Sequence, residues 1–246
     1  MKFCLIFLIT ISCSFKSILV TNLDYILTSK ISDNFDLEDG QEEILREDIK
    51  RFLGQNKPLA NKIKINILAF SLENINALKL LRNDYIEITK KMTPLISKHY
   101  NLLTKNQKNS LLKRERVKNL EIIKKNKEMT PKSIGKKYSN ILGYINEKQK
   151  LIIKKNFTMT VEMSAERVNR RINIQNKLSE AEDIKQIEDA FKIYSLSLEN
   201  DSKYKEKIFI YFKEIIESSN NDQKKAILNK KNEIIEFVDL IIKEEY

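Results

Sequence analysis

The sequence has few of the residues on which compact catalytic and metal sites depend. Its 246 residues include two Cys, one His and no Trp. Both cysteines, Cys4 and Cys13, lie near the start, so the body from Ser14 onward has no disulfide, thiolate nucleophile or cysteine metal site. With His99 as the single histidine, histidine-clustered metal sites and Ser-His or Cys-His catalysis are also excluded. Carboxylate-only chemistry remains open, but no acidic pair is distinguished, and we expect no enzyme, catalytic residue, metal or cofactor.

Glycine and proline are also scarce. Four Gly and three Pro leave little material for tight β-turns, whereas Ile, Leu, Lys, Glu and Asn dominate the composition. This bias favours helices with solvated faces. From the spacing of the helix caps we expect an all-α fold, an elongated bundle of about eight helices.

No uninterrupted hydrophobic run near the N-terminus is long enough to span a membrane, because Lys16 and polar residues interrupt the stretch from Phe3 to Val20. Lys2 followed by the apolar residues Phe3 to Ile11 is typical of a signal peptide. The segment Thr10-Ile11-Ser12-Cys13 resembles a bacterial lipobox, in which small residues precede a cysteine that receives diacylglycerol. Ser12 fits this pattern, whereas Thr10 stands where Leu is usual. The alternative is an ordinary signal peptide with an incidental cysteine.

On the lipobox interpretation, the chain divides into three parts. Residues 1–12 are a signal peptide, residues 13–21 hold the lipidated Cys13 and a tether, and residues 22–246 form a single all-helical domain. Lipoproteins that enteric-type bacteria keep in the inner membrane usually carry Asp after the lipidated cysteine. By resemblance to them, Ser14 favours sorting to the outer membrane. We therefore expect a lipoprotein of the cell envelope, anchored in the membrane by its N-terminal lipid and facing the periplasm.

Polar residues typical of helix starts recur along the body. Thr93 and Thr130 each precede a proline, which suits the first position of a helix. A capping box is predicted where a side chain at the start of a helix bonds forward and a Gln three residues later bonds back. The predicted boxes are Thr104 with Gln107, Asn146 with Gln149, and Asn220 with Gln223.

Together with Gln41, four predicted helices open with a glutamine at a matching place. Capping explains each occurrence, and a binding role for the glutamine side chains is the alternative. The gaps between these glutamines are irregular, which excludes a solenoid of fixed period.

The clearest single helix begins at Glu38 and Asp39, and Gly54 and Pro58 mark its end. Its apolar positions fall on one face, namely Ile44, Leu45, Ile49, Phe52 and Leu53. Residues 59–72 and 157–163 are ambiguous between helix and strand, because their apolar residues fit both periods. We favour helix in both, since no hairpin turn lies nearby.

Positive charge is concentrated between Lys105 and Lys137, where twelve Lys and Arg face three Glu in a chain of net charge +11. This pattern indicates either a solvated helix face or a surface for an anionic partner, such as a lipid headgroup or an acidic client. The candidate surface residues are Lys113, Arg114, Lys118, Lys124, Lys125 and Lys127. Nucleic acid is not expected, because no aromatic residue interleaves these charges. His99 is predicted to be a helix-surface or packing residue.

These features resemble a family of proteobacterial lipoproteins of unknown function (domain of unknown function 6279). The resemblance rests on the lipobox, Leu23-Asp24-Tyr25, Phe35-Asp36-Leu37 with Gln41, Leu103-Thr104 with Gln107, and more loosely Ile145 with Gln149. The chain departs from the family by having no Trp and by placing Asn146 where the family has Thr. The resemblance implies a helical, membrane-tethered envelope protein and assigns no catalytic residue.

The Leu-Thr-x-x-Gln element of Leu103 to Gln107 is also similar to that of small periplasmic chaperones of the Spy and CpxP kind. The expected function is therefore non-enzymatic binding or scaffolding at the periplasmic face of the outer membrane, with an envelope protein or an anionic lipid as partner. The alternative is a chaperone-like or stress-sensing protein that binds unfolded or anionic clients through residues 105–137.

Overall fold

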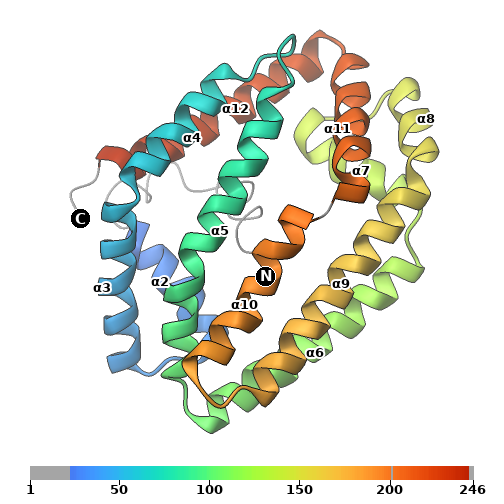
Figure 1. Ribbon diagram of the computed structural model, residues 1–246. Coiled ribbons are helices and arrows are strands. Elements are labelled where there is room, and N and C mark those ends of the chain that lie inside the picture. Colours follow the sequence, from blue (N-terminus) through green and yellow to red (C-terminus); the bar gives the residue numbers. More distant parts are fainter. Residues whose placement is uncertain (1–22, 201, 244–246) are drawn as a thin grey trace.

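The computed structural model describes residues 23–200 and 202–243, and every regular element within these ranges is an α-helix (Figure 1). The all-α prediction is confirmed. The helices are α2 (Leu23–Phe35), α3 (Asp39–Gln55), α4 (Lys57–Ala69), α5 (Ala77–Asn101), α6 (Lys105–Lys127), α7 (Pro131–Leu142), α8 (Glu147–Lys155), α9 (Phe157–Glu180), α10 (Ile184–Asn200), α11 (Ser202–Glu217) and α12 (Asn221–Lys243).

Eleven helices lie in the described ranges, so the predicted number of about eight is too low. Part of the difference comes from the break at Asn156 between α8 and α9, whereas the break at Asn56 between α3 and α4 agrees with the helix end predicted at Gly54 and Pro58. In each break the asparagine side chain donates to the carbonyl four residues earlier, at 2.7 Å to Phe52 O and 3.0 Å to Ile152 O. A side chain that bonds its own backbone competes with the helix, a feature that apolar spacing does not reveal.

Both ambiguous segments are helical where the structure gives them regular form. Residues 59–69 belong to α4, and residues 157–163 form the start of α9. Of the predicted apolar face of α3, Leu45, Ile49 and Leu53 are buried, whereas Ile44 is 48% exposed.

The predicted helix start at Thr93 is wrong. Thr93 and Pro94 lie inside α5, which continues through the proline. The Thr93 hydroxyl donates to the carbonyl of Thr89 at 3.0 Å, so it bonds backwards within the helix instead of capping a new one. Thr93 is buried, and the packing of α5 along α10 supports a helix that the local Thr-Pro pattern would end.

The helices fall into two halves with a corresponding order. Each half has a short helix (α2 or α7), a helix pair broken at asparagine (α3–α4 or α8–α9), a central segment (α5 or α10–α11) and a closing helix (α6 or α12). In Figure 1, α5 and α10 lie side by side in the middle, α4 runs with α12 along one edge, and α6 runs with α9 along the opposite edge. The two halves therefore interlock, since each edge pairs a helix of one half with a helix of the other.

Three hydrophobic clusters hold this arrangement together. The first joins α2, α3 and α4 to α12, and its buried residues include Leu45, Ile67 and Phe237. The second joins the end of α5 to α6, α9 and α10 around Tyr100. The third lies among α7, α8 and α11 around Tyr211. The second cluster borders the cavity described below.

Candidate functional site

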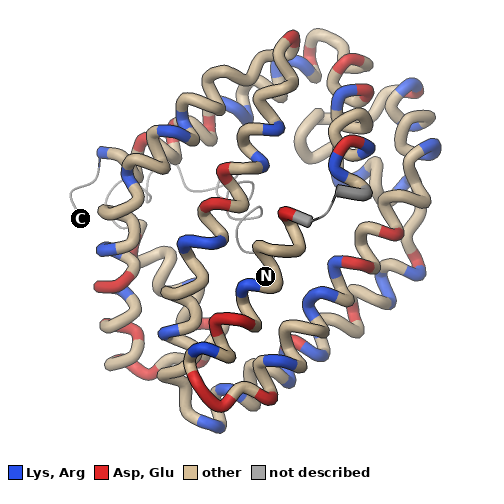
Figure 2. Tube along the Cα trace, viewed as in Figure 1, with Lys and Arg blue, Asp and Glu red and all other residues tan. Residues whose placement is uncertain are grey.

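The basic segment predicted from the sequence lies on α6 and α7, and Figure 2 shows Lys and Arg at intervals along α6. Two of the six candidate residues serve the fold. Arg114 pairs with the carboxylate of Asp36 and donates to Asn34 O at 2.5 Å, and Lys118 pairs with Glu115 at 2.8 Å.

The other four candidates differ from Arg114 and Lys118. Their side chains are exposed and make no hydrogen bond or ion pair to another residue in the described ranges; the four residues are Lys113, Lys124, Lys125 and Lys127. The side chain of Arg116 is also exposed and also has no such bond to another described residue.

Two large apolar side chains stand among these cations. Val117 is 50% exposed and Leu120 is 67% exposed. Steps of three and four residues along a helix return to the same face. The spacing therefore places Lys113, Arg116, Val117, Leu120, Lys124 and Lys127 on one face of α6. We call these six residues the cationic face.

The opposite face of α6 points into the molecule and carries a polar network with α9. Arg171 donates to Asn119 Oδ1 at 2.7 Å and pairs with Glu115 at 2.6 Å. Asn119 in turn donates to Gln175 Oε1 at 2.7 Å. Arg171, Asn119 and Gln175 are all buried, so the network holds α6 in a fixed rotation with the cationic face outward.

His99 is 2% exposed, so of the two roles predicted for it, helix surface or packing, it has the packing role. Its Nε2 atom lies 2.9 Å from Asp48 Oδ2, which also accepts from Lys98 Nζ at 2.5 Å. Burial lowers the pKa of His99, and the attraction of Asp48 only partly offsets that effect. Burial raises the pKa of Asp48, but the bonds from Lys98 and His99 outweigh it and leave this pKa below its ordinary value.

The four matching glutamines form two reciprocal amide pairs, which the sequence did not predict. At the starts of α3 and α6, Gln107 Nε2 donates to Gln41 Oε1 at 2.8 Å, and Gln41 Nε2 donates back at 3.4 Å. At the starts of α8 and α12, Gln223 Nε2 donates to Gln149 Oε1 at 3.0 Å, and Gln149 Nε2 donates back at 3.3 Å.

The two pairs share further geometry. Gln107 Nε2 donates to the carbonyl of Asp36, and Gln223 Nε2 donates to the carbonyl of Tyr144, which in each case precedes the partner glutamine by five residues. Each glutamine also accepts from the backbone N–H at the start of its own helix. The amide groups thus cap helices and join them, so we assign them a structural role.

The remaining predicted caps are present. Thr104 accepts from Gln107 N, Asn146 accepts from Gln149 N, and Thr130 accepts from Ser133 N. The Thr130 box closes through Ser133, whose hydroxyl accepts from the backbone N–H of Thr130 at 3.0 Å. Cys13 lies outside the described residues.

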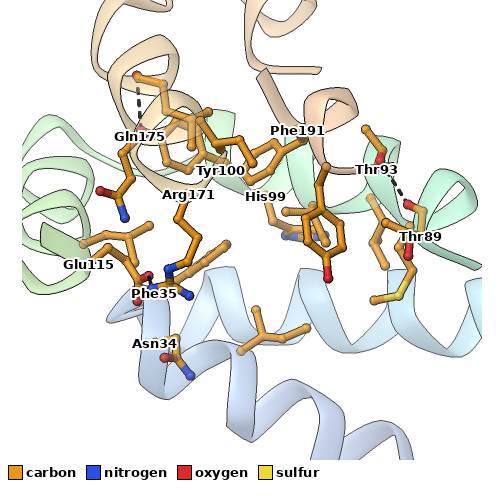
Figure 3. A pocket seen from close by; sticks show the side chains of 18 of the residues that line it. Asn34, Phe35, Thr89, Thr93, His99, Tyr100, Glu115, Arg171, Gln175 and Phe191 are labelled. Carbon is orange, nitrogen blue, oxygen red and sulfur yellow. Dashed lines mark hydrogen bonds and ion pairs between the residues drawn. The ribbon is translucent and has the colours of Figure 1, made fainter. Parts of the chain in front are cut away.

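A cavity of about 210 Å³ lies among α2, α5, α6, α9 and α10 (Figure 3). Most of its wall is apolar, and the lining includes Phe35, Met92, Leu112, Ile174 and Phe191. Figure 3 shows that Asn34, Glu115, Arg171 and Gln175 gather at one end, whereas Thr89 and Thr93 lie at the other. Tyr100 borders the cavity, and burial raises the pKa of its hydroxyl to about 12. This cavity could not be predicted from the sequence, because its lining comes from helices far apart along the chain.

Within residues 23–200 and 202–243, no group of three or more His, Cys, Asp or Glu side chains is arranged to hold a metal ion. No helix there combines the length and apolar character that crossing a membrane requires.

Comparison of the chain with protein-family models, with curated proteins and with solved structures finds no match in any of the three.

Proposed function

We propose that the protein is a non-enzymatic envelope lipoprotein that binds anionic phospholipid headgroups through the cationic face of α6. The observation that carries this proposal is the division of the basic residues into two groups. The side chains of Arg114 and Lys118 are paired within the fold, whereas the basic side chains of the cationic face and of Lys125 make no hydrogen bond or ion pair to another described residue.

The shape and chemistry of the surface suit a lipid headgroup layer. A helix of 23 residues is about 35 Å long, so α6 presents its cations along an extended line. The exposed side chains of Val117 and Leu120 lie among them, and basic residues around apolar ones are typical of helices that rest on a membrane surface. Lys132, Lys136 and Lys137 extend the positive charge onto α7.

The expected lipid at Cys13 adds a second reason. An acyl anchor together with a basic patch is a common combination for stable membrane attachment. An anchored body would keep the cationic face at high local concentration near the anionic lipids of the same membrane. Location at the periplasmic face of the outer membrane remains part of the proposal.

Vesicle flotation of the full-length chain tests this function. Changing Lys113, Lys124, Lys125 and Lys127 together to Gln should weaken binding to phosphatidylglycerol vesicles by at least about tenfold, because each lysine near an anionic surface contributes favourably. Binding to phosphatidylcholine vesicles should not change, since only the anchor acts there. The matched control changes four exposed lysines on other helices that also lack a partner among the described residues, namely Lys91, Lys148, Lys185 and Lys225.

Equal loss in both variants would mean that net charge alone acts, and no loss in either would refute the lipid-binding proposal. The chaperone-like alternative predicts another result. In that case the four-lysine change would leave flotation unaffected and would weaken the suppression of client aggregation. Mass spectrometry of the mature N-terminus tests the anchor separately, and an unmodified Cys13 would remove that part of the proposal.

A further inference from the structure

We propose that the cavity among α2, α5, α6, α9 and α10 is a binding site for a small uncharged amphiphile with an apolar body and a hydrogen-bond-accepting head. This site is separate from the cationic face, because the cavity is bordered by the inward face of α6, whereas the cationic face points outward.

The size of the cavity admits a small organic molecule. An apolar cavity of about 150 Å³ in another protein stays dry and binds benzene. The cavity described here is about 210 Å³, so it accommodates a ligand somewhat larger than benzene, such as a medium-length alkyl chain. A void of this size deprives its lining side chains of packing contacts, and a ligand that fills it restores them.

The hydrogen bonds of the lining residues favour an apolar body. Thr89 donates to Tyr85 O at 2.8 Å, and Thr93 donates to Thr89 O at 3.0 Å. The hydroxyls of Tyr85 and Tyr194 bond each other at 2.7 Å. A polar ligand at this end would have to break bonds within the protein, whereas an alkyl chain leaves them in place.

The opposite end of the cavity offers a place for a polar head. Gln175 is 7% exposed and uses its Oε1 atom to accept from Asn119, but its Nε2 donor has no hydrogen bond to another described residue. In Figure 3 the Gln175 amide lies at the same end as Glu115 and Arg171. An acceptor on the ligand would bond this donor, which belongs to a residue that is largely buried.

The charges at this end favour a neutral head. Arg171 and Glu115 form an ion pair at 2.6 Å, so neither charge is left to compensate a ligand of either sign. A charged head would lose its hydration without gaining an unpaired counter-ion. A hydroxyl or ester head avoids that cost.

Isothermal titration of the full-length chain with straight-chain alcohols from 1-butanol to 1-decanol tests the proposal. As long as the alkyl chain of the alcohol still fits within the cavity, each added methylene should tighten binding by about fourfold. Beyond the length that fits, the gain per methylene should fall sharply. An increase that continues unchanged to 1-decanol would indicate nonspecific association and would overturn the proposal, as would the absence of binding across the series.

Two variants locate the site. Thr89→Met places a larger side chain in the cavity and should reduce the affinity for the best alcohol at least about tenfold. The control is Thr160→Met on α9, where the threonine also bonds the carbonyl four residues earlier but does not line the cavity. Unchanged binding in a Thr89→Met variant that retains the helical circular dichroism of the wild type would refute the location.

If Thr89→Met does not fold, a second variant decides the matter. Gln175→Leu should weaken the alcohol but leave the binding of the alkane of equal chain length unaffected, because only the alcohol uses the amide donor. Equal effects on alcohol and alkane would refute the assigned head position.

Discussion

The glutamine pair at the starts of α3 and α6 and the pair at the starts of α8 and α12 have the same bonding pattern but differ in their access to water. Gln149 and Gln223 are both 0% exposed. Gln107 is 8% exposed and Gln41 is only partly buried. The first pair can therefore exchange protein partners for water, whereas the second cannot.

The neighbours of the second pair explain the difference. Gln149 Nε2 also lies within bonding distance of Ile215 O, in the last turn of α11, and of Ser219 Oγ, just beyond the end of that helix. Asn146 Nδ2 also donates to Ser218 O at 2.9 Å and to Gln223 Oε1 at 3.2 Å. At the first pair, Gln41 Nε2 donates to the carbonyl of Leu102, whose side chain is 45% exposed. The same pairing of glutamines therefore makes more hydrogen bonds, and is shielded from water, where the end of a neighbouring helix covers it.

The largest effect is expected when one member of the buried pair is removed. Gln223→Ala should lower the free energy of unfolding by about 3 kcal/mol, because it leaves the Gln149 amide buried without its partner. Gln41→Ala should cost about 1 kcal/mol, since water can reach the exposed pair. Urea denaturation followed by circular dichroism measures both values.

A paired substitution sharpens this result. The double variant Gln149→Leu with Gln223→Leu should cost less than the sum of the two single changes, because no buried amide is then left unpaired. Equal losses at the two pairs, or additivity at the buried pair, would contradict the role assigned to burial.

A smaller difference is expected between the caps that flank the pairs. Asn146→Ala should lower stability by about 2 kcal/mol, since the asparagine caps α8 and also donates across the junction. Thr104→Ala removes a cap alone and should cost about 1 kcal/mol. Thr130→Ala, at an exposed cap away from both pairs, is the control and should resemble Thr104→Ala. The three free energies of unfolding come from urea denaturation, and a cost at Asn146 no larger than at Thr130 would argue against the cross-junction bonds.

The smallest effect concerns pH and distinguishes the halves, because the single histidine of the chain lies in the first half. The pKa of His99 is lowered from 6.5 in the folded state, so the unfolded chain binds this proton more readily. The stability that the neutral form of His99 contributes is therefore fully present above about pH 6.5. It should be lost as the pH falls below that value. Asp48, whose pKa lies below its ordinary 3.8, adds a loss only at more acidic pH.

In the His99→Gln variant the free energy of unfolding should change little between pH 7 and about pH 5.5. The substitution removes the titrating group while keeping a donor toward Asp48. Urea denaturation at the two pH values measures the difference. If the wild type became more stable on acidification, the lowered pKa of His99 would be wrong. If Gln223→Ala removed the same pH dependence, the assignment to the first half would fail.

Local interactions account for what could be predicted from the sequence. The all-α class follows from the scarcity of Gly and Pro, and the capping boxes at Thr104 and Asn146 follow from residues three positions apart. The buried face of Leu45, Ile49 and Leu53 follows from helical periodicity. The same local reasoning placed a helix start at Thr93, where the packing of α5 overrides the Thr-Pro pattern.

The candidate site could be predicted only in part. The sequence indicated the basic segment, but it could not separate Lys113 and Lys124, which are unpaired among the described residues, from Arg114, which pairs with Asp36. That distinction depends on which side of α6 faces α2 and α9. The cavity lining likewise comes from residues as far apart as Ile31 and Tyr194.

The four glutamines show most clearly which features depend on the local sequence and which depend on the tertiary structure. The sequence by itself determined that Gln41, Gln107, Gln149 and Gln223 stand at helix starts, because capping depends on the backbone within one turn. Only the tertiary structure decided that they bond in pairs across 66 and 74 residues. The reason is that a side-chain amide has donors and acceptors to spare after capping its own helix, and the packing of distant helices determines which group meets them.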